Sequence, residues 1–264
     1  MRVGVITGTG TYALPGFELH ERHEVETPFG VAEVSEGAFA GVEVMHISRH
    51  GEGHVRLSSS VNHRAHVIAL KRLEADCVIG VTVCGAVDPE VPLGGLILFD
   101  DLHFPVNRLP DGSLCTLYPE AGDPERGHWI YEGPFSEGVR GALREGVAAA
   151  GLSLRDGGTY GHVDGPRFNT RSEIAALAAA GVTAVSQTAG SETVLCGEAE
   201  LPYALLGYAT DYANGVRDEA TPVEELLRLM GESTGTFARV LEATLPLLEG
   251  REPAPPGVVY RFEQ

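Results

Sequence analysis

The chain has 264 residues, of which 37 are acidic and 19 are basic, and its formal net charge is −18. A surplus of this size repels nucleic acid and anionic membrane at long range, so neither is expected as a partner, and an anionic substrate needs a local basic site. The four cysteines lack CxxC spacing, no apolar run reaches membrane-spanning length, and the first strand leaves no room for a leader peptide, so we expect a cytoplasmic protein.

The amino-terminal stretch combines a strand with a glycine turn. Val3–Thr7 is apolar and β-branched, and the turn Gly8–Thr11 that follows it has backbone amides that can cradle an anion. A dinucleotide-binding fingerprint would need a third glycine and a helix directly afterwards, but Ala13 fills that place. The turn therefore favours phosphate over a nicotinamide cofactor, and an oxidoreductase is the weaker alternative.

A compact basic pair follows the next predicted strands. Val31–Glu36 and Val42–His46 alternate enough to form antiparallel strands, and they lead to Arg49 and His50. A guanidinium fork matches phosphate oxygens in shape and charge, although a surface salt bridge would use the same residue type.

The remaining histidines of this half predict no metal site. His50 and His54 are four residues apart, but the glycines between them disfavour the helix that would align them. His63 and His66 fall on the predicted helix Val61–Leu73, where a core or solvated histidine is the default.

The middle of the chain continues the alternation of strands and helices. Cys77–Val83 and Leu96–Phe99 are predicted strands, and a tight turn is expected at Cys84–Ala86. Pro105–Gly133 is rich in proline, glycine and aspartate, and an excursion of this length usually forms a substrate lid or a subunit contact. Ser136–Ala150 has the apolar spacing of a helix.

Polar side chains follow two apolar runs in the segment 182–211, where we expect a ligand-binding site. Val182–Val185 and Tyr203–Thr210 read as buried parallel strands joined by the helix Ala189–Glu200. Ligands bind at the carboxyl ends of such strands, so Ser186–Thr188 and Asp211 should converge on one crevice. A carboxylate at the end of an apolar strand also needs a partner.

The carboxyl-terminal region predicts one long helix and a loose tail. Thr221–Leu248 is helical in composition, with expected interruptions at Gly231 and Gly235 and an end near Pro246. Residues 251–264 are expected to be loosely held.

Seven motifs together resemble the trimeric purine nucleoside phosphorylase family, specifically its methylthioadenosine phosphorylase branch. The motifs are TGTG at 7–10, SRHG at 48–51, VNHRAHVIALK at 61–71, VTVCGAV at 81–87, DGPRF at 164–168, AVSQTAGSETVLC at 184–196 and ATDY at 209–212. The resemblance implies one α/β domain over residues 1–264, a three-layer fold with a central mixed β-sheet flanked by helices. It also implies a homotrimer, or a dimer of such trimers, that needs no metal or cofactor and uses inorganic phosphate as a co-substrate with a purine nucleoside.

The resemblance also assigns roles to individual residues. Phosphate is expected at Thr9, Arg49, His50, Val83 through its backbone, and Thr188. The nucleoside is expected at Phe168, Asn169, Gln187, Asp211 and Asn214. Phe168 would stack on the purine, although its residue type fits a core aromatic equally well. Asp211 and His50 are the expected catalytic residues.

The chemistry of phosphorolysis explains these residue types. Cleavage of the C1′–N9 bond passes through a ribosyl cation, so the site needs an anionic nucleophile held at the sugar and a way to neutralise the departing purine. If burial raises the pKa of Asp211 so that it carries a proton, it can protonate N7 as a general acid.

Three positions depart from the family pattern and leave substrate choice open. Ala213 occupies the place of a second aspartate that reads a 6-amino group, and Asn169, with Asn214 nearby, occupies the place of a glutamate that reads 6-oxopurines. Gln187 replaces the usual methionine under the ribose, where an amide can hydrogen-bond a hydroxyl. A catalytically weakened nucleoside-binding trimer of the same family is the alternative function.

Overall fold

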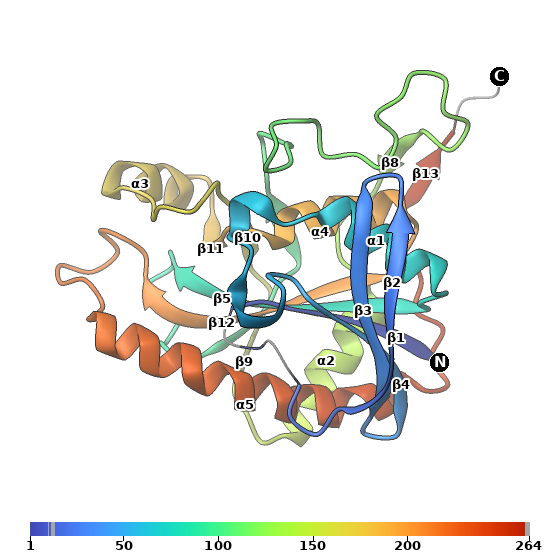
Figure 1. The fold of residues 1–264 in the computed structure, drawn as a ribbon. Helices are drawn as coiled ribbons and strands as arrows, with labels where there is room; N and C mark the ends of the chain where they lie inside the picture. The colour runs from blue at the N-terminus through green and yellow to red at the C-terminus, as the bar shows by residue number, and fades with distance from the viewer. Residues whose placement is uncertain (10, 12–13, 262–264) are drawn as a thin grey trace.

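The computed structural model describes residues 1–9, 11 and 14–261, and within them the chain forms an eleven-stranded mixed sheet with helices on both faces (Figure 1). The strands are β1 Arg2–Thr7, β2 Glu18–Thr27, β3 Gly30–Phe39, β4 Val42–Ser48, β5 Cys77–Ala86, β6 Leu96–Leu98, β7 Asp101–His103, β8 His128–Ile130, β9 Leu154–Asp156, β10 Thr159–His162, β11 Val182–Ser186, β12 Tyr203–Tyr212 and β13 Val258–Tyr260. The helices are α1 His63–Arg72, α2 Glu137–Ala149, α3 Arg171–Ala179, α4 Ala189–Glu198 and α5 Val223–Leu248, with the short 3₁₀ helices η1 Glu52–His54 and η2 Ser58–Ser60.

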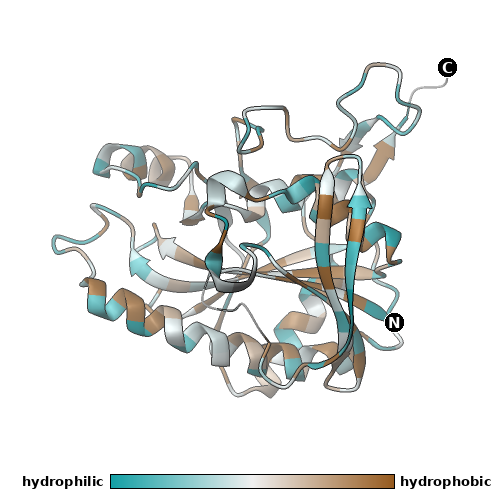
Figure 2. Cartoon of the chain, viewed as in Figure 1, coloured by the Kyte–Doolittle hydropathy of each residue, from teal (hydrophilic) through white to brown (hydrophobic). Residues whose placement is uncertain are grey.

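Two apolar cores lie on opposite faces of this sheet. On one face α1 and α4 contribute Leu70 and Leu195, and on the other α2 and α5 contribute Leu143 and Leu241. Figure 2 shows hydrophobic residues along the central strands, whereas α5 alternates hydrophobic and hydrophilic residues as an amphipathic helix does. The expected three-layer α/β fold with a central mixed sheet is therefore confirmed. No helix in the described ranges is both long and apolar enough to span a membrane.

The centre of the sheet is β5, and it corrects two predictions. The tight turn expected at Cys84–Ala86 is wrong, because β5 continues through these residues and pairs there with β11 and β12. Gly85 has an extended backbone, and its missing side chain leaves room for Asp211, whose Oδ2 would lie only 3.1 Å from an added Cβ. The glycine marks a close approach rather than a turn.

The strands β11 and β12 are not parallel neighbours, contrary to the sequence-based expectation. Both pair with β5, but β12 runs parallel to it over its length and β11 runs antiparallel to it at Ala184 and Val185. An apolar run shows that a strand is buried but not which way it runs, because direction depends on the partner that long-range folding supplies. The predicted antiparallel pair β3 and β4 is confirmed.

The helix α5 is continuous, so the expected interruptions at Gly231 and Gly235 are wrong. Nothing lies within 4 Å of a Cβ added at either glycine, which places both on the open side of the helix. The opposite side buries Phe237 and Leu245 against the sheet and α2. This burial outweighs the cost of about 1 kcal/mol for each internal glycine. The expected end near Pro246 is confirmed, since α5 ends at Leu248 with Pro246 inside its last turn.

The chain's last described residues are not a loose tail. Within the long excursion, β8 pairs antiparallel with β13, and the two lie side by side at the upper right of Figure 1. The indole Nε1 of Trp129 donates to the carbonyl of Pro256 at 2.8 Å, and Ser136 Oγ donates to Ala254 O at 2.7 Å. The expectation of a loose segment is therefore wrong for 254–260, and residues 262–264 lie outside the described part. The edge strand β2 was also not predicted, since its exposed polar sequence lacks an apolar alternation.

Candidate active site

One cavity of about 270 Å³ opens where β1, β4, β5, β11 and β12 carry their polar residues. All ten residues expected to bind phosphate or nucleoside line it: Thr9, Arg49, His50, Val83, Phe168, Asn169, Gln187, Thr188, Asp211 and Asn214. The predicted convergence of Ser186–Thr188 with Asp211 is thus confirmed. Sequence reasoning missed other lining residues, including Ser58 of η2 and Leu226 and Met230 of α5, because neither segment carries a motif.

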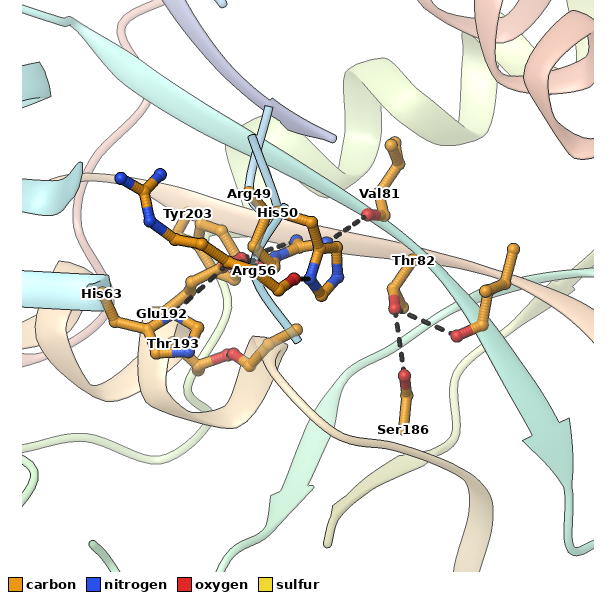
Figure 3. A network of polar contacts seen from close by, with 12 residues as sticks. Arg49, His50, Arg56, His63, Val81, Thr82, Ser186, Glu192, Thr193 and Tyr203 are labelled. Carbon is orange, nitrogen blue, oxygen red and sulfur yellow. Dashed lines mark hydrogen bonds and ion pairs between the residues drawn. The ribbon is translucent and has the colours of Figure 1, made fainter. Parts of the chain in front are cut away.

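The guanidinium of Arg49 is fully buried and already held by a carboxylate. Nε donates to Glu192 Oε1 and Nη2 donates to Oε2 at 2.8 Å, while Nη1 reaches the carbonyl of Val81 at 3.3 Å (Figure 3). Burial opposes the charge on Arg49, but Glu192 outweighs it and raises the arginine pKa. The fork that the sequence suggested for phosphate therefore faces Glu192, and Nη1, packed directly against Gly8, is the part nearest the glycine turn.

Glu192 is the partner of Arg49, a role that we did not predict from the sequence. It lies in the first turn of α4, is fully buried, and also accepts a hydrogen bond from the Tyr203 hydroxyl at 3.2 Å. Burial works against its charge, but Arg49 lowers its pKa, so it remains a carboxylate. It lies within the motif at 184–196, and its position in the first turn of a helix, where the helix dipole favours an acid, was a second signal.

The ring of His50 is neutral, and a hydrogen bond to the backbone of Arg56 fixes its orientation. Its Nδ1 lies 2.9 Å from the carbonyl of Arg56, which can only accept, so Nδ1 carries the hydrogen and Nε2 keeps a lone pair. Burial first and the charge of Arg49 second lower the pKa of His50 to about 4. The ring stacks on His54, with centroids 4.5 Å apart. His50 can therefore accept a hydrogen bond from a hydroxyl, such as that of monohydrogen phosphate.

The amino-terminal end of α4 lies at the cavity wall, where Thr188 lines the cavity. The helix begins at Ala189 directly after Thr188, which is buried at the cavity wall and makes no capping hydrogen bond with its own side chain. A helix amino terminus favours an anion through its amides and its dipole. Nearby, the hydroxyls of Thr82 and Ser186 meet at 3.2 Å and join β5 to β11 (Figure 3).

Asp211 is buried and has a hydrogen-bond partner. It is 8% exposed near the end of β12, and burial raises its pKa. The hydroxyl of Thr210 donates to its Oδ1 at 2.9 Å, which partly opposes the shift because it stabilises the carboxylate. A carboxyl group in this setting can hold a proton and release it to a base.

Phe168 is 62% exposed at the cavity edge, so it is not a core aromatic. It lies between β10 and α3, two residues before Thr170, which caps the amino terminus of α3 in a capping box with Glu173. An exposed aromatic ring beside a cavity is suited to stacking on a flat ligand.

Two of the three side-chain amides expected at the nucleoside are engaged with protein groups. Gln187 Oε1 accepts from Ser58 Oγ at 2.8 Å, and its Nε2 donates to the carbonyl of Arg167 at 3.1 Å. Asn214 Nδ2 donates to the carbonyl of Asn169 at 2.7 Å. In contrast, the side-chain amide of Asn169 makes no hydrogen bond among the described residues. The described part of the chain contains no group of three or more histidine, cysteine, aspartate or glutamate side chains placed to hold a metal ion.

A buried guanidinium and a carboxyl group with a raised pKa thus share one cavity on a mixed α/β sheet, and the fold is that of a nucleoside phosphorylase. The chain belongs to the phosphorylase superfamily, whose family model matches residues 2–246.

The similarity to named nucleoside phosphorylases extends over nearly the whole chain. The 6-oxopurine nucleoside phosphorylase of Pyrococcus furiosus is 29% identical over 252 residues, which are 94% of this chain and 93% of that protein. The probable S-methyl-5′-thioinosine phosphorylase of Pseudomonas syringae is 32% identical over 246 residues, covering 91% and 98%. Methylthioadenosine phosphorylase from Schistosoma mansoni, solved with adenine, superposes with a TM-score of 0.85 at 25% identity, covering 95% and 92%.

Proposed function

We propose that the protein cleaves the N-glycosidic bond of purine nucleosides or 5′-deoxy-5′-methylthionucleosides with inorganic phosphate. The products are the free purine base and ribose 1-phosphate or 5-methylthioribose 1-phosphate. The observation that carries the proposal is that one cavity holds the buried Arg49 with the neutral His50, and also Asp211 with its raised pKa.

The residues divide the reaction between two ends of the substrate. At the anion end, Arg49, the α4 amino terminus and the hydroxyls of Thr9 and Thr188 hold phosphate, and His50 accepts from its hydroxyl. A phosphate oxygen forms a bond to C1′ as the C1′–N9 bond breaks and its electron pair moves to the purine. Asp211 then gives its proton to N7. The scheme uses phosphate as a co-substrate and needs no metal or cofactor.

The base that suits the cavity best is a 6-oxopurine. Ala213 is 7% exposed and has no group that can accept from a 6-amino substituent. The unpartnered amide of Asn169 can donate to O6. Two of the relatives named above carry 6-oxopurine or thioinosine in their names, which supports the same choice.

A phosphorolysis panel of adenosine, inosine, guanosine, methylthioadenosine and methylthioinosine tests this proposal. We expect phosphate-dependent base release, with kcat/KM for 6-oxopurines about fivefold or more above that for 6-aminopurines, the effect of one lost hydrogen bond. The control variant Ala213→Asp should shift this ratio toward 6-aminopurines. Nucleoside binding without base release would instead support the alternative, a catalytically weakened nucleoside-binding trimer.

We also propose that the enzyme is a cytoplasmic homotrimer, or a dimer of such trimers. Exposed apolar side chains gather in the long excursion, where Leu114 and Ile130 are each 57% exposed and Tyr131 is 42% exposed. Exposed apolar side chains that gather in one place are usually buried in an interface, which a second copy of this chain can provide. The four cysteines are free and buried, which suits a reducing compartment. A monomer by light scattering at micromolar concentration would contradict the assembly.

A further inference from the structure

The segment 163–170 between β10 and α3, here called the base loop, carries Phe168 and Asn169 to the cavity without forming a helix or strand of its own. Phe168 packs little of its ring against the protein, since 62% of it is exposed. Val163 packs against an apolar cluster at the start of the loop, but the ring of Phe168 adds little such packing, so polar contacts to the backbone contribute to the order of the loop around Phe168.

One side of the base loop is held by Gln187, which follows β11. Its Nε2 donates to Arg167 O at 3.1 Å, and its Oε1 accepts from Ser58 Oγ at 2.8 Å, so the side chain bridges η2 and the loop. Gly165 lies so close to this amide and to the Ser58 hydroxyl that a side chain at position 165 would collide with both. Both polar ends of Gln187 are thus used within the protein.

The other side is held by Asn214, which follows β12. Its Nδ2 donates to Asn169 O at 2.7 Å. Between these two contacts, Arg167 Nη1 donates to Phe168 O at 3.2 Å while its guanidinium is paired with Glu173. Three consecutive carbonyl groups on the base loop therefore each accept from a side chain, and two of the donors come from outside the loop.

We propose that Gln187 and Asn214 are positioning residues, which clamp the base loop on both sides of Phe168 before substrate arrives and do not bind the nucleoside themselves. This inference rests on the proposed function for its effect on catalysis. A loop ordered in advance does not have to lose its conformational freedom on binding, so the clamp strengthens purine binding without touching the purine. Gln187 can do this where methionine could not, because a thioether has no donor.

Amide hydrogen exchange in the substrate-free enzyme tests whether Gln187 and Asn214 position the base loop or bind the nucleoside directly. In Gln187→Met and in Asn214→Asp, we expect exchange of the peptide covering the base loop to rise about fivefold, which is the weight of one lost hydrogen bond. The nucleoside KM should rise by about the same factor, whereas kcat and the phosphate KM should stay within about twofold.

Two further variants act as matched controls. Ser58→Ala removes the anchor of Gln187 without altering either amide, and it should raise base-loop exchange in the same direction. Asn169→Ala removes a side chain with no internal hydrogen bond, so it should raise the nucleoside KM and leave exchange unchanged.

Exchange that stays at the wild-type level in Gln187→Met, Asn214→Asp and Ser58→Ala would overturn the clamp, whether or not KM changes. A raised KM with unchanged exchange would make these amides direct ligands. Because exchange is measured without substrate, this outcome is independent of the proposed function, which fails separately if the wild-type enzyme releases no base with phosphate.

Discussion

Replacement of Asp211 by asparagine is expected to lower kcat about a hundredfold or more, while nucleoside binding stays within about tenfold of wild type. Asparagine keeps the size of the side chain and can still hydrogen-bond N7, but it has no acidic proton to transfer. The burial that raises the pKa of Asp211 is what makes the acid form available. Wild-type turnover of this variant on every purine nucleoside of the panel would exclude Asp211 as the general acid.

The pH dependence of kcat gives an independent check on Asp211. The active form is protonated, so kcat should fall as the pH rises through the raised pKa, and Asp211→Asn should lack this alkaline limb. Thr210→Val is the informative control, because the Thr210 hydroxyl stabilises the carboxylate and lowers its pKa. Its removal should move the limb to higher pH. A limb that persists in Asp211→Asn would belong to another group.

Replacement of Arg49 by alanine is expected to have two effects of different origin. The phosphate KM should rise at least about tenfold, because the proposed phosphate site loses its buried guanidinium. Stability should fall by about 3–5 kcal/mol, because the buried Glu192 carboxylate loses its main partner. Phosphate-dependent initial rates and urea unfolding measure the two effects separately.

A second substitution distinguishes these effects. Adding Glu192→Gln to Arg49→Ala removes the stranded charge, so it should recover part of the stability while the phosphate KM stays high. Arg228→Ala serves as a surface control: its ion pairs with Glu225 and Glu232 are exposed, so little change in stability is expected. A phosphate KM that is unchanged in Arg49→Ala would remove Arg49 from the anion site.

Local sequence predicted several elements whose pattern depends on near neighbours. The apolar runs of β1, β11 and β12, the apolar spacing of α2 and the polar residues that end β11 and β12 all lie in short segments. The resemblance carried by the motifs then brought together residues far apart in the chain, and all ten of them line one cavity.

Long-range contacts decided what short segments do not encode. The direction of β11 against β5 and the continuity of α5 through Gly231 depend on which surfaces are buried against each other. Long-range contacts also decide the hydrogen bonds at the site. The guanidinium of Arg49 donates to Glu192, and the side-chain amide of Gln187 bonds to Ser58 and to the base loop. A side chain's residue type limits the bonds it can make, but only its buried neighbours determine which of those bonds remain for a substrate.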